Sequence, residues 1–193
     1  MTKRLLIAVF AVATAASVLL TGCVPLVIAG AAGGTALVVA DRRSVGTQAD
    51  DEAIELKIAN NIGAGFGDRV HVNVTSYDAI VLLTGEVPTA ELRTSINEIA
   101  RTTAKVRRVD DELTIGSVSS IGSRTNDSYI TSKVKARFVE ANKFAPNHVK
   151  VVTERQVVYL MGLVRHSEAE TAAQLAATTS GVVRVVKLFE YID

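Results

Sequence analysis

The side chain with the most distinctive chemistry in this 193-residue sequence is its single thiol, Cys23. Residues 5–20 before it are almost wholly apolar, and Lys3 and Arg4 give the chain a positively charged start. A charged start, an apolar stretch and small residues at a cleavage point are the layout of a secretory signal. Because the sequence has no second cysteine, the thiol has no partner for a disulfide within the chain, and we expect a different modification.

Residues 20–23 read Leu-Thr-Gly-Cys, which resembles a bacterial lipobox. The resemblance implies that residues 1–22 are removed as a signal peptide and that Cys23 is diacylated on sulfur and acylated on its new amino group. Two or three acyl chains anchor a protein stably at a membrane, whereas one chain binds only marginally. The alternatives are an ordinary signal peptide with a chance cysteine, and a transmembrane helix.

A second apolar stretch, residues 24–40, follows the cysteine and is rich in glycine and alanine. Its length approaches that of a membrane-spanning helix. Pro25 and the glycines at 30, 33 and 34 disfavour such a helix. We therefore predict a lipidated N-terminus and flexible leader over residues 23–49, at or near the membrane surface, with a second spanning helix as the alternative.

The remaining chemistry-bearing residues form no recognisable catalytic pattern. His71, His148 and His166 are scattered, and nothing supplies the spacing of a metal site. No motif places a serine nucleophile, and "GAAGGT" lacks the lysine of a phosphate-binding loop. Neither half of the chain is basic enough to predict nucleic-acid binding. The sequence thus predicts no enzyme, no cofactor and no metal.

An internal repeat organises the rest of the chain. Shifting the sequence by 77 residues places "VHVNVTSYDAIVLLTGEV" over "HVKVVTERQVVYLMGLV", so that Gly85 meets Gly162 and Val87 meets Val164. Further upstream the offset is 76, and Ile54, Ile58 and Ile62 meet Ile130, Val134 and Phe138. The chain therefore contains two copies of one module.

Each copy has the same predicted order of elements. An apolar stripe at four-residue spacing indicates a first helix, with Asp50 or Asp51 and Asp127 at the N-cap positions. Two short β-rich runs, a second helix and a last strand follow, with Gly85 or Gly162 at the end of the hairpin. The predicted fold class is α+β, with a small three-stranded mixed sheet on two helices in each copy. The predicted segments are domain 1 at 50–115, a linker at 116–126 and domain 2 at 127–193.

The repeat resembles the BON domain, a module of bacterial envelope proteins. The matching features are the early helical stripe, Val72 to Val74, the Leu-x-Gly-x-Val steps at 83–87 and 160–164, and the Val-x-x-Val steps at 106–109 and 183–186. Two copies behind a lipobox resemble the family of dual BON-domain outer-membrane lipoproteins that are linked to division and to phospholipid binding. The resemblance implies a monomeric, non-enzymatic, lipid-anchored protein that faces the periplasm. Its second copy would bind anionic phospholipid and support outer-membrane integrity, with the division site as one place of action.

The charges of the two copies agree with phospholipid binding by the second copy. Residues 50–115 carry 7 Lys and Arg against 12 Asp and Glu, whereas residues 127–193 carry 9 against 7. Tyr129, Lys133 and Arg137 share a stripe beside the apolar stripe of the second copy's first helix, and Lys135 adds charge on another side. Tyrosine suits the headgroup layer, and cations attract anionic lipid.

We predict lipid contact through Tyr129, Lys133, Arg137 and Lys135, with Gly162 allowing close backbone approach. A merely solvated helix face is the alternative for these cations, and a hairpin end is the alternative for the glycine. A rival function is a periplasmic adaptor that binds a periplasmic or outer-membrane protein through the acidic residues Asp50, Asp51, Glu52 and Glu55 of the first copy.

Overall fold

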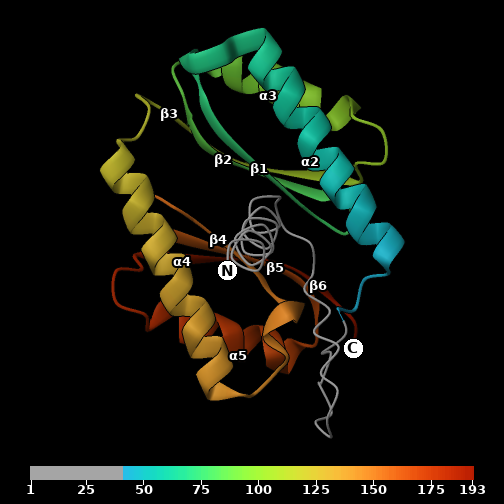
Figure 1. Cartoon of the computed structure of the whole chain (residues 1–193), viewed down its shortest axis with the longest axis vertical. Coiled ribbons are helices and arrows are strands. Elements are labelled where there is room, and N and C mark those ends of the chain that lie inside the picture. Colours follow the sequence, from blue (N-terminus) through green and yellow to red (C-terminus); the bar gives the residue numbers. More distant parts are fainter. Residues whose placement is uncertain (1–40) are drawn as a thin grey trace, which may run out of the picture. The chain divides into compact units, whose positions relative to one another are not determined.

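The computed structural model describes residues 41–193, so the predicted signal peptide, the lipobox with Cys23 and most of the leader lie outside the described residues. Two copies of an α-β-β-α-β module follow one another, each with its own three-stranded mixed sheet (Figure 1). The predicted α+β fold class is confirmed.

Both copies contain the same elements in the same order. The first consists of α2 (Val45–Phe66), a 3-10 turn η2 (Gly67–Arg69), β1 (His71–Tyr77), β2 (Ile80–Val87), α3 (Ala90–Thr102) and β3 (Arg108–Ile115). The second consists of α4 (Ile121–Ala141), η3 (Pro146–His148), β4 (Lys150–Glu154), β5 (Val157–Val164), α5 (His166–Ala177) and β6 (Arg184–Tyr191). In each sheet the middle strand pairs antiparallel with the strand before it and parallel with the last strand.

The first helix of each copy begins earlier than the sequence predicted. Ser44 caps α2 by accepting a hydrogen bond from the amide of Thr47, and Ser120 caps α4 in the same way. Asp51 and Asp127 are therefore not N-caps but buried residues inside the helices. Because α4 starts at Ile121, it includes residues 121–126 of the predicted linker.

The buried aspartates hold the hairpin turns instead. Asp51 accepts hydrogen bonds from the backbone amides of Asp78 and Ala79, both at 2.8 Å, and from the hydroxyl of Ser76 at 2.6 Å. Asp78 and Ala79 have φ angles of 50° and 63°, the left-handed conformation that a tight two-residue turn between strands requires. The second copy repeats this arrangement with Asp127 and the amides of Arg155 and Gln156.

Each copy has a hydrophobic core between its sheet and its helices, and the predicted apolar stripe of its first helix contributes to that core. A third cluster lies on the other face of the sheets and contains residues of both copies: Tyr77, Ile80, Leu82, Tyr159 and Met161. All eight residues of β2 are buried, because the strand has a core on each face. The sheet face that does not carry the helices is therefore covered by the other copy.

No helix within residues 41–193 combines the length and the apolar character needed to cross a membrane.

Candidate functional site

The exposed side of α4 presents two of the predicted lipid-binding residues as a pair. Tyr129 is 62% exposed, and the ammonium group of Lys133 lies 4.7 Å from the centroid of its ring. The same ammonium group donates a hydrogen bond to the backbone carbonyl of Ser180. Burial of the neighbouring stripe, Ile130, Val134 and Phe138, fixes this orientation. A cation held above an exposed aromatic ring is suited to the boundary between water and an apolar phase.

Arg137 makes contacts within the fold. Its Nη1 atom donates to the carbonyl of Leu175 at 2.6 Å and lies within 3.0 Å of the hydroxyls of Thr178 and Thr179. These groups lie at the carboxyl end of α5, where unpaired carbonyls attract a positive charge. The predicted lipid-binding stripe is thus divided, because Arg137 joins α4 to α5 while Tyr129 faces solvent.

Lys135 lies on a different side of α4, beside an open cavity of about 440 Å³. Two further cations, Arg43 and Lys150, line this cavity, and Val139, which is 63% exposed, adds an apolar wall. Arg43 and Lys150 pair with carboxylates of the first copy, whereas Lys135 lies on the exposed surface. The structure therefore does not gather the four predicted side chains at one point, but distributes them over two sides of one helix.

Gly162 is buried within β5 and not at the end of the hairpin. A Cβ atom at this position would lie 2.3 Å from the carbonyl oxygen of His148, so no other residue fits without a shift of the backbone. Gly85 occupies the equivalent place in β2, where a Cβ atom would lie 2.0 Å from the carbonyl oxygen of His71. Of the two explanations that the sequence left open, close approach of the neighbouring backbone accounts for Gly162.

The segment before α2 contributes contacts that the sequence did not indicate. Arg42 forms a two-pronged ion pair with Glu168 of α5, at 2.7 and 2.9 Å, and also donates to the carbonyl of Leu163. Hydrogen bonding to Arg42 lowers the pKa of Glu168 below its ordinary value, although burial opposes this shift. The end of the leader is thereby fixed to the second copy.

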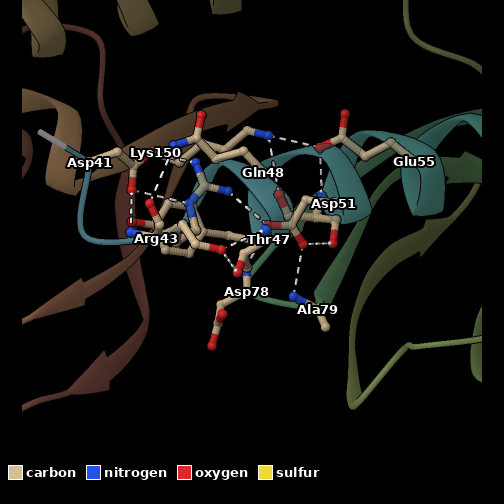
Figure 2. A network of polar contacts seen from close by, with 12 residues as sticks. Asp41, Arg43, Thr47, Gln48, Asp51, Glu55, Asp78, Ala79 and Lys150 are labelled. Carbon is tan, nitrogen blue, oxygen red and sulfur yellow. Dashed lines mark hydrogen bonds and ion pairs between the residues drawn. The ribbon is translucent and has the colours of Figure 1, made fainter.

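Arg43 ties the same segment to the first copy. Figure 2 shows its guanidinium group between Asp41 and Asp51, and each is paired with it at 2.8 Å. The guanidinium also stacks over the ring of Tyr77 at 3.8 Å from the centroid. Both arginines lie outside the repeated module, and contacts between residues so far apart in the chain have no characteristic spacing, so the sequence carries no signal of them.

The acidic surface of the first copy is largely occupied. Asp51 is buried in its turn, Asp50 pairs with Lys105 at 2.6 Å, and Glu55 pairs with Lys150 of the second copy at 2.7 Å. Of the four acids predicted to attract a protein partner, three therefore have partners within the chain. This arrangement does not favour the adaptor function.

The family follows from the repeat. A model of the BON domain matches residues 50–117 and again residues 126–193. The chain belongs to the BON-domain family. It is 36% identical over 185 residues to "Outer membrane lipoprotein DolP" of Haemophilus influenzae, an alignment that covers 95% of both chains.

Two further relatives extend this similarity. The chain is 32% identical over 155 residues to "21 kDa hemolysin" of Actinobacillus pleuropneumoniae, covering 79% of this chain and 80% of that protein. It is 31% identical over 106 residues to "Osmotically-inducible protein Y" of Escherichia coli, covering 54% of this chain and 50% of that protein.

Proposed function

We propose that this chain is an outer-membrane lipoprotein that is anchored through Cys23, faces the periplasm and binds anionic phospholipid through its second BON copy. The proposed role is not enzymatic. The protein supports the integrity of the outer membrane, and the division site is one place where it acts. The similarity to an outer-membrane lipoprotein along almost the whole chain supports the location. The observation that carries lipid binding is the exposed Tyr129 with the Lys133 ammonium group above its ring.

The electrostatics of α4 support contact with an anionic surface. Each lysine or arginine near such a surface contributes about 1 kcal/mol of attraction. Lys133, Lys135 and Lys143 of the second copy lie along or just after this helix, whereas the equivalent surface of α2 combines Lys57 with Glu52 and Glu55. The first copy would therefore be repelled where the second copy is attracted. In this proposal Arg137 and Gly162 contribute indirectly, because they maintain the fold of the second copy.

The anchor and the helix would act together. An acyl tether keeps the second binding site at a high local concentration near the bilayer, so a weak intrinsic affinity for headgroups suffices. Arg42 and Arg43 connect the end of the leader to the folded copies, which shortens the free tether.

Vesicle co-sedimentation of residues 41–193 tests the lipid-binding step without the anchor. We expect binding to rise when phosphatidylglycerol is added to phosphatidylcholine vesicles and to fall when the salt concentration is raised. Exchanging Lys133 and Lys135 for glutamate should weaken binding to anionic vesicles by at least about tenfold, which corresponds to two lost attractions and added repulsion. The matched control is Lys57→Glu, the position in α2 that is equivalent to Lys133, and it should bind as the parent does.

Equal binding to neutral and anionic vesicles, or an equal loss in the Lys57→Glu control, would remove the electrostatic part of this proposal. The anchor has its own test, which is incorporation of labelled palmitate into the full chain in cells. Cys23→Ser should abolish the label, and label retained in that variant would contradict acylation at Cys23.

A further inference from the structure

Two glutamates and a histidine meet between the two copies. Glu86 of β2 is fully buried, Glu154 at the end of β4 is 5% exposed, and His71 at the start of β1 is partly buried. One potential ligand atom from each residue lies within 4.8 Å of those of the other two. Two of these side chains come from the first copy and one from the second.

Only one oxygen of each carboxylate is hydrogen bonded. Oε2 of Glu86 accepts from the amide of Ser119 and lies 3.0 Å from Nδ1 of His71, and Oε2 of Glu154 accepts from Nδ2 of Asn73 at 2.8 Å. The Oε1 atoms of both glutamates are buried and have no hydrogen-bond partner among residues 41–193. A buried carboxylate oxygen that has lost its water and gained no donor is strongly unfavourable.

The repeat shows that the module does not need these carboxylates. By the offset of 77 residues, Leu163 is equivalent to Glu86, and Tyr77 is equivalent to Glu154. Tyr77 is buried against the second copy, with its hydroxyl 3.5 Å from the carbonyl oxygen of His148. The side chains at these two equivalent positions are therefore neutral, although Arg43 lies over the ring of Tyr77 and Arg42 donates to the carbonyl of Leu163. At the other end of the interface the same two positions are both acids. The excess negative charge at that end points to a cation.

We infer that His71, Glu86 and Glu154 form a zinc site that joins the two BON copies. A neutral imidazole and two carboxylates together carry a charge of −2, which a divalent ion balances. Magnesium and calcium prefer ligands that are all oxygen, whereas zinc accepts a mixture of histidine nitrogen and carboxylate oxygen. Zinc–ligand bonds of about 2.1 Å place neighbouring ligand atoms about 3.4 Å apart in a tetrahedron, so small side-chain rotations would close the site.

The site has a route to solvent. An open cavity of about 420 Å³ is lined by His71, Asn73 and Glu154, together with residues of α4 that include Arg124 and Asp127. A zinc ion could enter from this cavity, and water from it could complete the coordination at the fourth position. Because the ligands come from both copies, bound zinc would stabilise the interface together with the fold.

Titration of the full chain in detergent micelles tests this site. After removal of metals with EDTA and of the chelator by dialysis, calorimetric titration with zinc chloride should give one site per chain. The thermal unfolding midpoint should rise with zinc concentration. Magnesium chloride at the same concentrations should leave the midpoint unchanged, and an equal rise with magnesium would overturn the assignment to zinc.

Isosteric variants identify the ligands. Glu154→Gln and Glu86→Gln should each weaken zinc binding by at least about tenfold. Without metal, both should be at least as stable as the parent, because each removes a buried charge that lacks a full set of partners. Glu170→Gln is the matched control on an exposed site and should bind zinc as the parent does. Because Glu154→Gln and Glu86→Gln change no residue outside the site, zinc bound elsewhere in the chain would not respond to the change at Glu154. Unchanged zinc affinity in Glu154→Gln, or no binding to the parent, would overturn the inference.

Discussion

At the scale of single residues, one buried carboxylate in each copy decides how the hairpin turns. The residues at the turn in the first copy, Asp78 and Ala79, adopt positive φ angles without a glycine between them. Asp51 stabilises this conformation because it accepts the hydrogen bonds of both turn amides. The side chain lies about two helical turns beyond the N-cap Ser44, too far along α2 to act as a cap. Its role becomes visible only when the hairpin lies against the helix.

Asp51→Asn should lower the free energy of unfolding by about 2 kcal/mol at neutral pH, because an amide cannot accept all these hydrogen bonds. Urea unfolding measures the change. Asp127→Asn is the matched control in the second copy, where only two amide bonds are made, and it should cost about 1 kcal/mol. An equal or larger loss in the Asp127 variant would contradict the added role of Ser76 and Arg43 at Asp51.

The stability conferred by Asp51 should also depend on pH. Burial alone would raise the pKa of this carboxyl group, but hydrogen bonds from Ser76, from the two turn amides and from Arg43 outweigh burial and lower it. A lowered folded-state pKa gives stability that is complete above the unfolded value of about 4 and is lost as the pH falls through the folded value. The difference in unfolding free energy between the parent and Asp51→Asn should therefore be constant above about pH 5, which is roughly one pH unit above the unfolded-state pKa. The difference should shrink as the pH falls below about 4.

The glycines of the middle strands are required for a steric reason. Gly162→Ala should destabilise the protein by about 1–3 kcal/mol, because its Cβ atom would overlap the carbonyl oxygen of His148. Gly63→Ala is the control, since a Cβ atom there meets nothing within 4 Å and α2 should gain about 0.5–1 kcal/mol. Thermal unfolding followed by circular dichroism distinguishes these outcomes. A Gly162→Ala protein of unchanged stability would show that the strands can separate at no cost.

At the scale of elements, the different sides of α4 make different contacts. Its apolar stripe packs on the second sheet, Arg137 binds the carboxyl end of α5, and Tyr129 and Lys135 face solvent. The four-residue spacing groups Arg137 with Tyr129 and Lys133 on the outward stripe, because residues that are three or four positions apart lie on the same side of a helix. A long side chain can nevertheless reach a neighbouring element, and here the end of α5 and the two threonines that follow it supply three acceptors.

Arg137→Ala should therefore act on stability, with an expected loss of about 1–3 kcal/mol from the broken charge-assisted hydrogen bonds. Lys135→Ala, two residues away and exposed, should change the unfolding free energy by less than about 0.5 kcal/mol. Chemical denaturation of both variants, beside vesicle binding, separates a structural role from lipid contact. If Arg137→Ala lost vesicle binding with no loss of stability, Arg137 would be a lipid contact and not a link between helices.

At the scale of the whole folded part, the two copies share a hydrophobic cluster that neither could bury alone. Leu82 and Met161 are within 1% of complete burial, and Tyr159 lies beside them with a hydroxyl 3.4 Å from Glu112. Burial, with a contribution from the charge of Glu112, raises the pKa of Tyr159 to about 12, so its hydroxyl stays neutral at ordinary pH. Small modules gain proportionally more from such mutual burial than large domains do.

Met161→Lys should separate the copies, because burial of an unpaired ammonium group is costly. The new ammonium group can reach solvent only if the interface between the copies opens. Amide hydrogen exchange should quicken in β2 and β5, while the helices of each copy keep their protection. The control is Leu56→Lys, which makes the same kind of change at an apolar residue that is 59% exposed. Slow exchange retained in both middle strands would show that the cluster does not hold the copies together.

The sequence by itself determined the module, its duplication and its family. Helical stripes such as Ile54, Ile58 and Ile62, and strand runs such as 80–87, depend on interactions between near neighbours in the chain, and these are visible as periodicity. The continuous apolar character of residues 80–83 is also typical of a strand that is buried on both faces, although the sequence alone did not decide what covered the second face.

Only the tertiary structure decided the polar contacts. Arg42 meets Glu168 across 126 residues of chain, and Glu154 approaches His71 and Glu86 because the two sheets pack against each other. Such pairs have no characteristic spacing, since their distance depends on the relative placement of whole elements. For the same reason the sequence placed Asp51 and Asp127 at helix ends and Arg137 in solvent, whereas folding gives each a partner on another element.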